Sequence, residues 1–251
     1  CTRRKVFMIT KTRGIVLRSV RFGESSLIVD VLTKSSGRVS FMVHIPKTSK
    51  GKIKKQYFQP MTLLDFEYDF RQRSNLQRIK DVRVSLPYSS IPIDPAKSCI
   101  SLFLSEFIYY ATRNEQENPT LFTYISTSLE WLDNAYEDFA NFHLVFMMRL
   151  GKFLGFHPFL EDFTPGCFFD LRNGCFTLSM PLHTDFLNAA DAGHLYNLMR
   201  MNFDTMKLFK LSHDDRNRIT EIVLRYYKLH LPNMPELQSF DILREVFAHE
   251  I

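Results

Sequence analysis

The sequence predicts an α+β protein, in which a small N-terminal β-barrel is followed by a mainly helical domain with a small inserted hairpin. Three observations support this prediction. Short stretches of alternating polar and apolar residues come first, longer stretches with helical periodicity follow, and the charge changes from basic to acidic between them. A cluster of prolines beginning at Pro87 marks the change. We therefore expect a basic domain at 8–88, an acidic domain at 89–251, and an upstream extension at 1–7.

The basic domain contains a series of candidate β-strands separated by turn residues. The alternation is clearest where Val39, Phe41 and Val43 are interleaved with Ser40 and Met42, which predicts a strand with one buried face. The candidate strands span residues 12–20, 26–33, 38–45, 61–70 and 76–86. Short strands of this number and spacing favour a small closed barrel, and the OB-fold is the common five-stranded barrel that binds oligonucleotides.

The charge of the chain is strongly asymmetric. Up to Tyr88 there are 19 Lys and Arg against 6 Asp and Glu, a balance of +13, whereas the rest has 13 against 21, a balance of −8. A solvated surface explains an isolated charged run, but an excess over a whole domain indicates a polyanionic partner. Nucleic acid is the favoured partner, with an anionic membrane as the minor alternative.

A lysine-rich stretch between the third and fourth candidate strands ends just before Tyr57 and Phe58. Lysines neutralise phosphates and aromatic rings can stack on bases, although a solvated loop and a core role for the two rings are alternatives, the core role being favoured. Gly51 and Lys52 do not form a P-loop, because Ile53 replaces the required Ser or Thr. The candidate DNA-binding residues are Lys11, Arg13, Arg18, Arg21, Arg38, Lys47, Lys50, Lys52, Lys54, Lys55, Arg71 and Arg73.

The acidic domain has the periodicity of a helical protein. In the segment 214–231, the residues Ile219, Ile222 and Tyr226 share one stripe, and Ser212 is placed as its N-cap. Between 156 and 181 the helical rhythm stops, and Asn173-Gly174 favours a tight hairpin turn. The helices are expected at 96–112, 121–132, 139–154, 183–201, 214–231 and 240–249.

The cysteines of this insertion allow two interpretations. Cys167 and Cys175 could join His157 and His183 in a zinc site, but neither cysteine belongs to a Cys-x-x-Cys pair and the spacings are irregular. We expect instead that both thiols are buried beside Phe168, Phe169 and Phe176, so that the insertion resembles a degenerate zinc finger without metal.

Sequence motifs for catalysis and for membrane insertion are lacking. No zinc-hydrolase, serine-hydrolase or compact acidic nuclease motif is found, so we expect a protein that is not an enzyme and uses no cofactor. No apolar run is long enough for a membrane helix, and a cytoplasmic location is expected. A nucleic-acid enzyme with an unrecognised metal site is the least favoured alternative.

Several ordered motifs resemble the RecO recombination-mediator family. They are the stretch GIVLRSVRFGESSLI from Gly14, the stretch GKFLGF from Gly151, and Tyr226-Tyr227 with His230 and Pro232 near the end. The resemblance implies an OB-fold followed by a helical domain, binding of single- and double-stranded DNA, and strand annealing. It also implies assistance in loading RecA onto DNA coated with single-strand-binding protein, with RecR and that binding protein as partners. Many members carry a four-cysteine zinc site, from which this sequence departs.

One alternative remains open among binding proteins. An OB-fold that grips phosphates could equally belong to an RNA-binding protein acting on structured RNA, because a phosphate grip alone does not separate the two nucleic acids.

Overall fold

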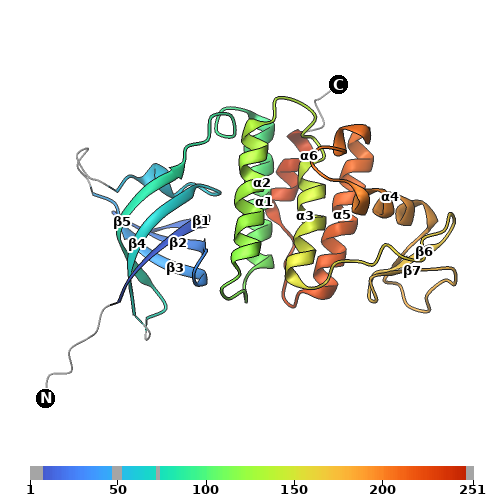
Figure 1. Ribbon diagram of the computed structural model, residues 1–251, viewed down its shortest axis with the longest axis horizontal. Helices are drawn as coiled ribbons and strands as arrows, with labels where there is room; N and C mark the ends of the chain where they lie inside the picture. The colour runs from blue at the N-terminus through green and yellow to red at the C-terminus, as the bar shows by residue number, and fades with distance from the viewer. Residues whose placement is uncertain (1–7, 47–52, 72–73, 247–251) are drawn as a thin grey trace, which may run out of the picture. The chain divides into compact units, whose positions relative to one another are not determined.

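The computed structural model describes residues 8–46, 53–71 and 74–246, which form two compact units (Figure 1). The first unit ends at Asp133 and the second begins at Asn134. The change from strands to helices after Leu86 therefore falls inside the first unit, which contains a barrel and most of two helices. None of the helices in the described ranges has the length and apolar character needed to cross a membrane.

The first unit begins with a closed five-stranded barrel, as predicted, with strand order β1-β2-β3-β5-β4. β1 is longer than predicted at both ends, because its first half pairs with β4 and its second half with β2, with a bulge between Val16 and Arg18. β3 and β5 close the barrel through two parallel pairs, Phe41 with Gln77 and Met42 with Arg78. The strands are β1 (Met8–Phe22), β2 (Ser26–Thr33), β3 (Gly37–His44), β4 (Leu63–Phe70) and β5 (Gln77–Leu86).

Aromatic rings fill the barrel. Phe41 meets Phe66 and Tyr68 edge to face, with ring centroids 5.2 and 5.1 Å apart. The short helix η1 (Lys55–Phe58) places Phe58 in this core, where it is 1% exposed, with Tyr57 half-buried against it. The favoured core role is thus confirmed for Phe58, whereas Tyr57 packs against the same core but remains half-buried.

The two helices after the barrel are α1 (Pro95–Ala111) and α2 (Pro119–Asn134). Asp94 caps α1 by accepting a hydrogen bond from the Lys97 backbone N–H at 3.1 Å. The Ser105 hydroxyl on α1 donates to the Leu17 carbonyl on β1. This contact fixes one side of α1 against the barrel.

The second unit combines helices with a small sheet. The Ser212 hydroxyl accepts a hydrogen bond from the Asp215 backbone N–H at 3.1 Å, which confirms the predicted N-cap of α5. The helix predicted at 183–201 begins instead at Ala189, because Phe186–Leu187 forms β8 and pairs with β6. The elements are α3 (Phe142–Leu154), β6 (Phe168–Asp170), β7 (Cys175–Thr177), β8 (Phe186–Leu187), α4 (Ala189–Arg200), η2 (Met206–Leu208), α5 (His213–His230) and α6 (Gln238–Val246).

Candidate nucleic-acid interface

Two of the predicted cations, Lys11 and Arg13, are paired with carboxylates on the neighbouring strand. The Lys11 ammonium lies 2.7 Å from Glu67, and the Arg13 guanidinium lies 3.1 Å from Asp65. Arg83 on β5 approaches the same Asp65 at 3.2 Å. Opposite charges face each other here because these residues are register partners on β1, β4 and β5.

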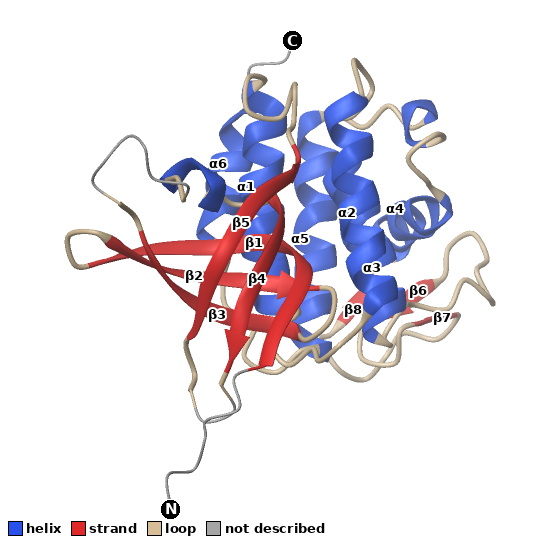
Figure 2. Cartoon of the chain, turned by 60° about the vertical axis from the view of Figure 1, so that its left-hand side comes forward, coloured by secondary structure: helices blue, strands red, loops and turns tan. Residues whose placement is uncertain are grey.

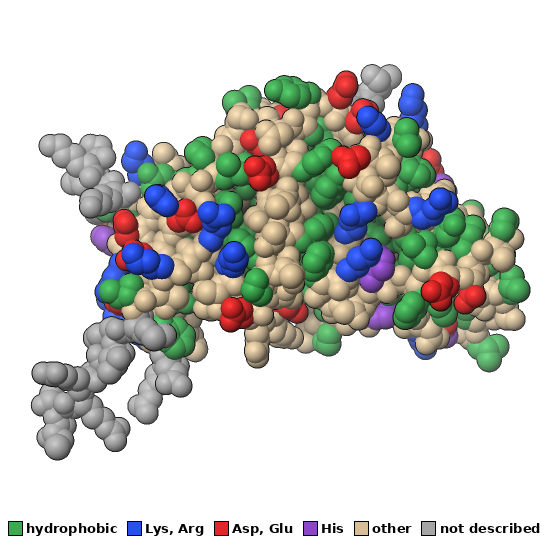
Figure 3. All heavy atoms as spheres, viewed as in Figure 1, with side chains coloured by type: hydrophobic (Ala, Val, Ile, Leu, Met, Phe, Trp, Pro, Cys, Tyr) green, Lys and Arg blue, Asp and Glu red, His purple; other side chains and the backbone are tan. Residues whose placement is uncertain are grey.

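We call this set the carboxylate ladder; it comprises Lys11, Arg13, Asp65, Glu67, Asp81 and Arg83. The hydrogen bond with Glu67 raises the pKa of Lys11. Burial alone would raise the pKa of Asp65. The hydrogen bonds that Asp65 accepts from Arg13 and Arg83 have the opposite effect, and the pKa of Asp65 is lowered. Figure 3 shows basic and acidic side chains interleaved over the barrel. Cations held in this way are less available to a phosphate.

Arg18 and Arg38 both bind Tyr109 on α1. The Arg38 guanidinium lies 4.6 Å from the centre of the tyrosine ring and donates a hydrogen bond to the Tyr109 carbonyl at 2.6 Å. Arg18 lies 5.3 Å from the same ring and donates to its hydroxyl at 3.3 Å. These contacts connect the barrel to α1, so the two arginines have a structural role whether or not they also contact DNA.

The remaining predicted cations lie in several places. Arg21, Lys54 and Lys55 are exposed, and Arg21 donates to the Gly23 carbonyl at 3.2 Å. Arg71 is half-buried after β4, where the Gln77 side chain binds its backbone N–H at 2.8 Å. Lys47, Lys50, Lys52 and Arg73 lie outside the described residues.

The outer face of β1, β2 and β3 differs in chemistry from the ladder. Register partners share a face, and here they form rows that cross the three strands. In Figure 2 these strands extend together to the β1–β2 turn. We call this surface the three-strand face; its rows are Phe22–Ser26–His44, Val20–Ile28–Met42 and Arg18–Asp30–Ser40.

Exposed apolar side chains are the unusual feature of the three-strand face. Phe22 is 52% exposed and Val20 is 41% exposed, although both are large and apolar. Arg78, the parallel register partner of Met42, extends the second row onto β5. Arg21 precedes Phe22 and is exposed at the end of β1, but its register partner is the buried Leu27, so it points to the opposite side of the strand. An exposed aromatic ring on a face that also carries a cation can stack a base while the cation neutralises a phosphate.

Sequence reasoning missed Phe22, Val20 and Arg78 as members of a candidate site. The predicted first strand ended at Val20, so Phe22 was assigned to the turn. The alternation of Arg18, Val20 and Phe22 was the available signal, since residues two apart on a strand share a face. No comparable signal existed for Arg78, whose place depends on the pairing of β3 with β5.

The insertion of the second unit does not fit a zinc site. Cys167 is buried, but Cys175 is only half-buried, which corrects the prediction that both thiols are buried. His157 binds the Met148 carbonyl at 3.2 Å, and His183 lies 3.3 Å from Asp170. Across the described ranges, no three His, Cys, Asp or Glu side chains are grouped as metal ligands would be.

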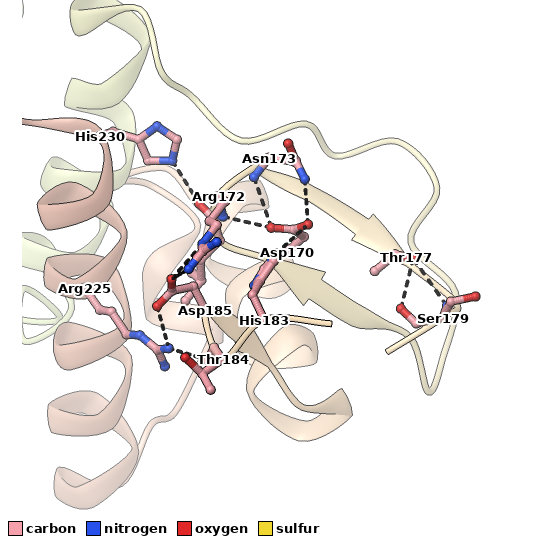
Figure 4. A network of polar contacts seen from close by, with 11 residues as sticks. Asp170, Arg172, Asn173, Thr177, Ser179, His183, Thr184, Asp185, Arg225 and His230 are labelled. Atoms are coloured by element: carbon pink, nitrogen blue, oxygen red, sulfur yellow. Dashed lines mark hydrogen bonds and ion pairs between the residues drawn. The ribbon is translucent and has the colours of Figure 1, made fainter. Parts of the chain in front are cut away.

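Hydrogen bonds around Asp170 organise the insertion instead (Figure 4). The Asp170 carboxylate accepts hydrogen bonds from the Arg172 backbone N–H at 2.9 Å and from the Asn173 side chain at 2.7 Å. Burial would raise the pKa of Asp170, but hydrogen bonds from the Asn173 backbone N–H at 3.1 Å, the Asn173 side chain and the Arg172 backbone N–H outweigh burial and lower this pKa. Asp185 joins the insertion to α5 by accepting from Arg172 at 2.8 Å and from Arg225 at 3.2 Å. The predicted hairpin forms, but its connection spans residues 171–174 and is not a two-residue turn at Asn173-Gly174, because Asp170 pairs with Cys175 and only Gly174 of that pair has a positive φ, 64°.

Comparisons with known proteins identify the family. The model of the recombination protein O N-terminal region matches residues 8–88, and that of its C-terminal region matches residues 93–238. The DNA repair protein RecO of Phocaeicola vulgatus is 47% identical over 241 residues, which are 96% of this chain and all of that protein. RecO of Bacteroides fragilis has the same identity and coverage. RecO of Flavobacterium psychrophilum is 34% identical over 243 residues, again 96% of this chain and all of the relative.

These relatives are named as DNA repair proteins, and the RNA-binding alternative finds no support among them. Both halves of the chain match in order, and the barrel followed by helices agrees with this division. The chain therefore belongs to the RecO family, with a role in DNA repair and recombination.

Proposed function

We propose that the barrel holds single-stranded DNA on its three-strand face, largely without regard to sequence. The observation that carries this proposal is the exposed Phe22 ring in a row with Ser26 and His44, with Arg78 in the neighbouring row. A ring of this kind stacks on any base, and cations beside it neutralise the backbone that connects the bases. The face includes β2 and β3, and strands 2 and 3 are the ones whose face OB-folds use for oligonucleotides.

The edges of the three-strand face limit where single-stranded DNA can lie. Arg18 and Arg38 bind Tyr109 at one end, so α1 bounds the surface there. Arg78 lies at the β5 side, and the β1–β2 turn with Phe22 lies at the far end. Double-stranded DNA would use the same cations, but the contribution of Phe22 needs unpaired bases.

The proposed activity is that of a recombination mediator without bond chemistry. Holding one strand by its backbone leaves its bases open for pairing, which favours annealing to a complementary strand. In this proposal the acidic helical part, residues 89–251, binds partner proteins. The protein then assists RecA loading onto DNA coated with single-strand-binding protein, with RecR as the second partner and the cytoplasm as the location.

An annealing assay tests this function. Complementary strands coated with the cognate single-strand-binding protein are mixed with the full chain, and duplex formation is followed by fluorescence. Faster annealing than with the coated strands alone is the expected result, and Phe22→Ala should reduce it. Absence of both annealing and binding to coated DNA would contradict the proposal.

A metal-dependent nuclease assay on the same strands covers the enzymatic alternative. We expect the strands to stay intact with Mg²⁺, Mn²⁺ or Zn²⁺ present. Cleavage that depends on one of these ions would show that the protein is an enzyme.

A further inference from the structure

A cavity of about 550 Å³ lies within the first unit, away from the three-strand face. Its walls come from η1 and the connection to β4, from the end of β5, and from α1. Tyr57, Leu86, Tyr88 and Leu102 give it apolar and aromatic surfaces, and no lining residue in the described part of the chain carries a charge. A cavity of this size with mostly apolar walls is typical of a binding site.

Ser101 in the wall on α1 supplies an independent indication of a ligand. The residue is only 5% exposed, and its hydroxyl has no hydrogen-bond partner within the described part of the chain. Other buried serines and threonines of these helices are satisfied, as Thr112 is by the Ile108 carbonyl at 2.7 Å. A buried hydroxyl without a partner is destabilising, and a polar group brought to this wall would satisfy it.

The end of β5 beside the cavity has an edge that pairs with no strand among the described residues. β5 pairs along its length with β4, but it pairs with β3 only at Gln77 and Arg78. No other described strand borders the edge from Ile79 to Leu86, and Val84 and Leu86 of this stretch line the cavity. An open edge offers backbone N–H and C=O groups in alternation, which an extended peptide can pair with.

We propose that this cavity binds an extended, apolar and uncharged peptide segment of a partner protein. The segment runs beside the free edge of β5, its side chains fill the space between the tyrosines and Leu102, and one of its polar backbone groups meets the Ser101 hydroxyl. The uncharged walls exclude phosphates and acidic or basic side chains, because a buried charge without a partner is costly. Leu102, 42% exposed at the rim, is the residue that the peptide would cover.

Selection from a random twelve-residue peptide library displayed on phage, with the immobilised full chain as target, tests the proposal. We expect selected peptides to share an uncharged apolar core. Synthetic copies should bind the Leu102→Glu variant at least about tenfold more weakly, since that carboxylate would enter an apolar contact. Leu160→Glu is the matched control, because Leu160 is 38% exposed in the other unit and should leave binding unchanged.

Ser101→Ala separates a binding role from a structural one. Removing an unsatisfied hydroxyl should raise the melting temperature of the free protein, while peptide affinity falls about two- to tenfold. DNA affinity should not change in either cavity variant, so a failure here is distinct from a failure of the DNA-binding proposal.

Four outcomes would overturn the proposal. The first two are that no peptide is selected and that the selected peptides have a charged core. The third is that the selected peptides bind the Leu102→Glu and Leu160→Glu variants equally well. The fourth is that the chain associates with itself and that Leu102→Glu abolishes this self-association. The last outcome would identify a second copy of the chain as the occupant.

Discussion

The barrel carries nearly the same kinds of basic residue on two surfaces, but their surroundings differ. On the carboxylate ladder, Lys11 and Arg13 face Glu67 and Asp65 at 2.7 and 3.1 Å. On the three-strand face, Arg78 is exposed in a row with Val20, Ile28 and Met42. The comparison teaches that a net charge of one sign attracts nucleic acid, whereas the local pairing of charges decides which surface it contacts.

The largest expected effect is the loss of two exposed cations, Arg78 on the three-strand face and Arg21 at the end of β1. The double variant Arg21→Ala, Arg78→Ala should weaken binding to single-stranded DNA and make the salt dependence shallower by about 1.4, at roughly 0.7 per lost phosphate contact. Fluorescence anisotropy with a labelled oligothymidine over a range of salt concentrations measures both. The control is Lys11→Ala, Arg13→Ala, which removes two ladder cations and should change the slope little. Equal slopes in the two double variants would remove the distinction between the surfaces.

Phe22→Ala should give the next largest effect. Loss of one stacked base costs about 1–3 kcal/mol of binding free energy, and the salt slope should stay unchanged because no charge is removed. Folding should be preserved, since Phe22 is 52% exposed. Val20→Ala is the matched apolar control without a ring. An unchanged affinity, or an altered slope, would show that Phe22 does not stack on a base.

Arg38→Ala should act on stability more than on DNA. The change removes the contact with the Tyr109 ring at 4.6 Å and the hydrogen bond to its carbonyl, which together stabilise the folded unit by about 1–2 kcal/mol. Chemical denaturation of the variant measures the loss. Arg21→Ala, which removes an exposed cation, is the control. A large drop in DNA affinity without loss of stability would assign Arg38 to the interface instead.

The smallest effect is expected from Glu67→Gln on the ladder. This variant leaves Lys11 without its ion pair, so the pKa of Lys11 should fall toward its ordinary value while the side chain stays protonated at neutral pH. The freed ammonium becomes available to a phosphate, and the salt slope should steepen by about 0.7. Stability should change little, because exposed ion pairs contribute little to the folded state. An unchanged slope would mean that DNA does not reach this surface even when its charge is free.

The barrel could be predicted because the order of polar and apolar residues within each strand indicates which side chains are buried. Val39, Phe41 and Val43 alternate with polar residues along one strand, and that pattern is a property of neighbouring residues. The helix predicted from residue 183 was wrong at its start, because β8 (Phe186–Leu187) forms by pairing with β6, which lies earlier in the chain. A pairing between two strands that are separated in the sequence leaves no pattern among neighbouring residues.

The candidate site was less predictable for the same reason. Arg18 and Arg38 are held by Tyr109, which is 91 and 71 residues away in the sequence. The pairing of Arg13 with Asp65 spans 52 residues. Counting charges identified the basic domain, but only the side-chain contacts show which cations pair with a carboxylate: Arg78 is opposite Asp69 on β4, yet Asp69 pairs with Lys80.

The most direct test of the account is a map of where DNA contacts the barrel. Backbone amide signals of the isotopically labelled full chain are followed by NMR while an oligothymidine is added. The account predicts that the amides of Phe22, Ile28, Met42 and Arg78 shift, and that those of Lys11, Glu67 and Asp81 do not. Shifts concentrated on the carboxylate ladder, with the three-strand face unchanged, would contradict it.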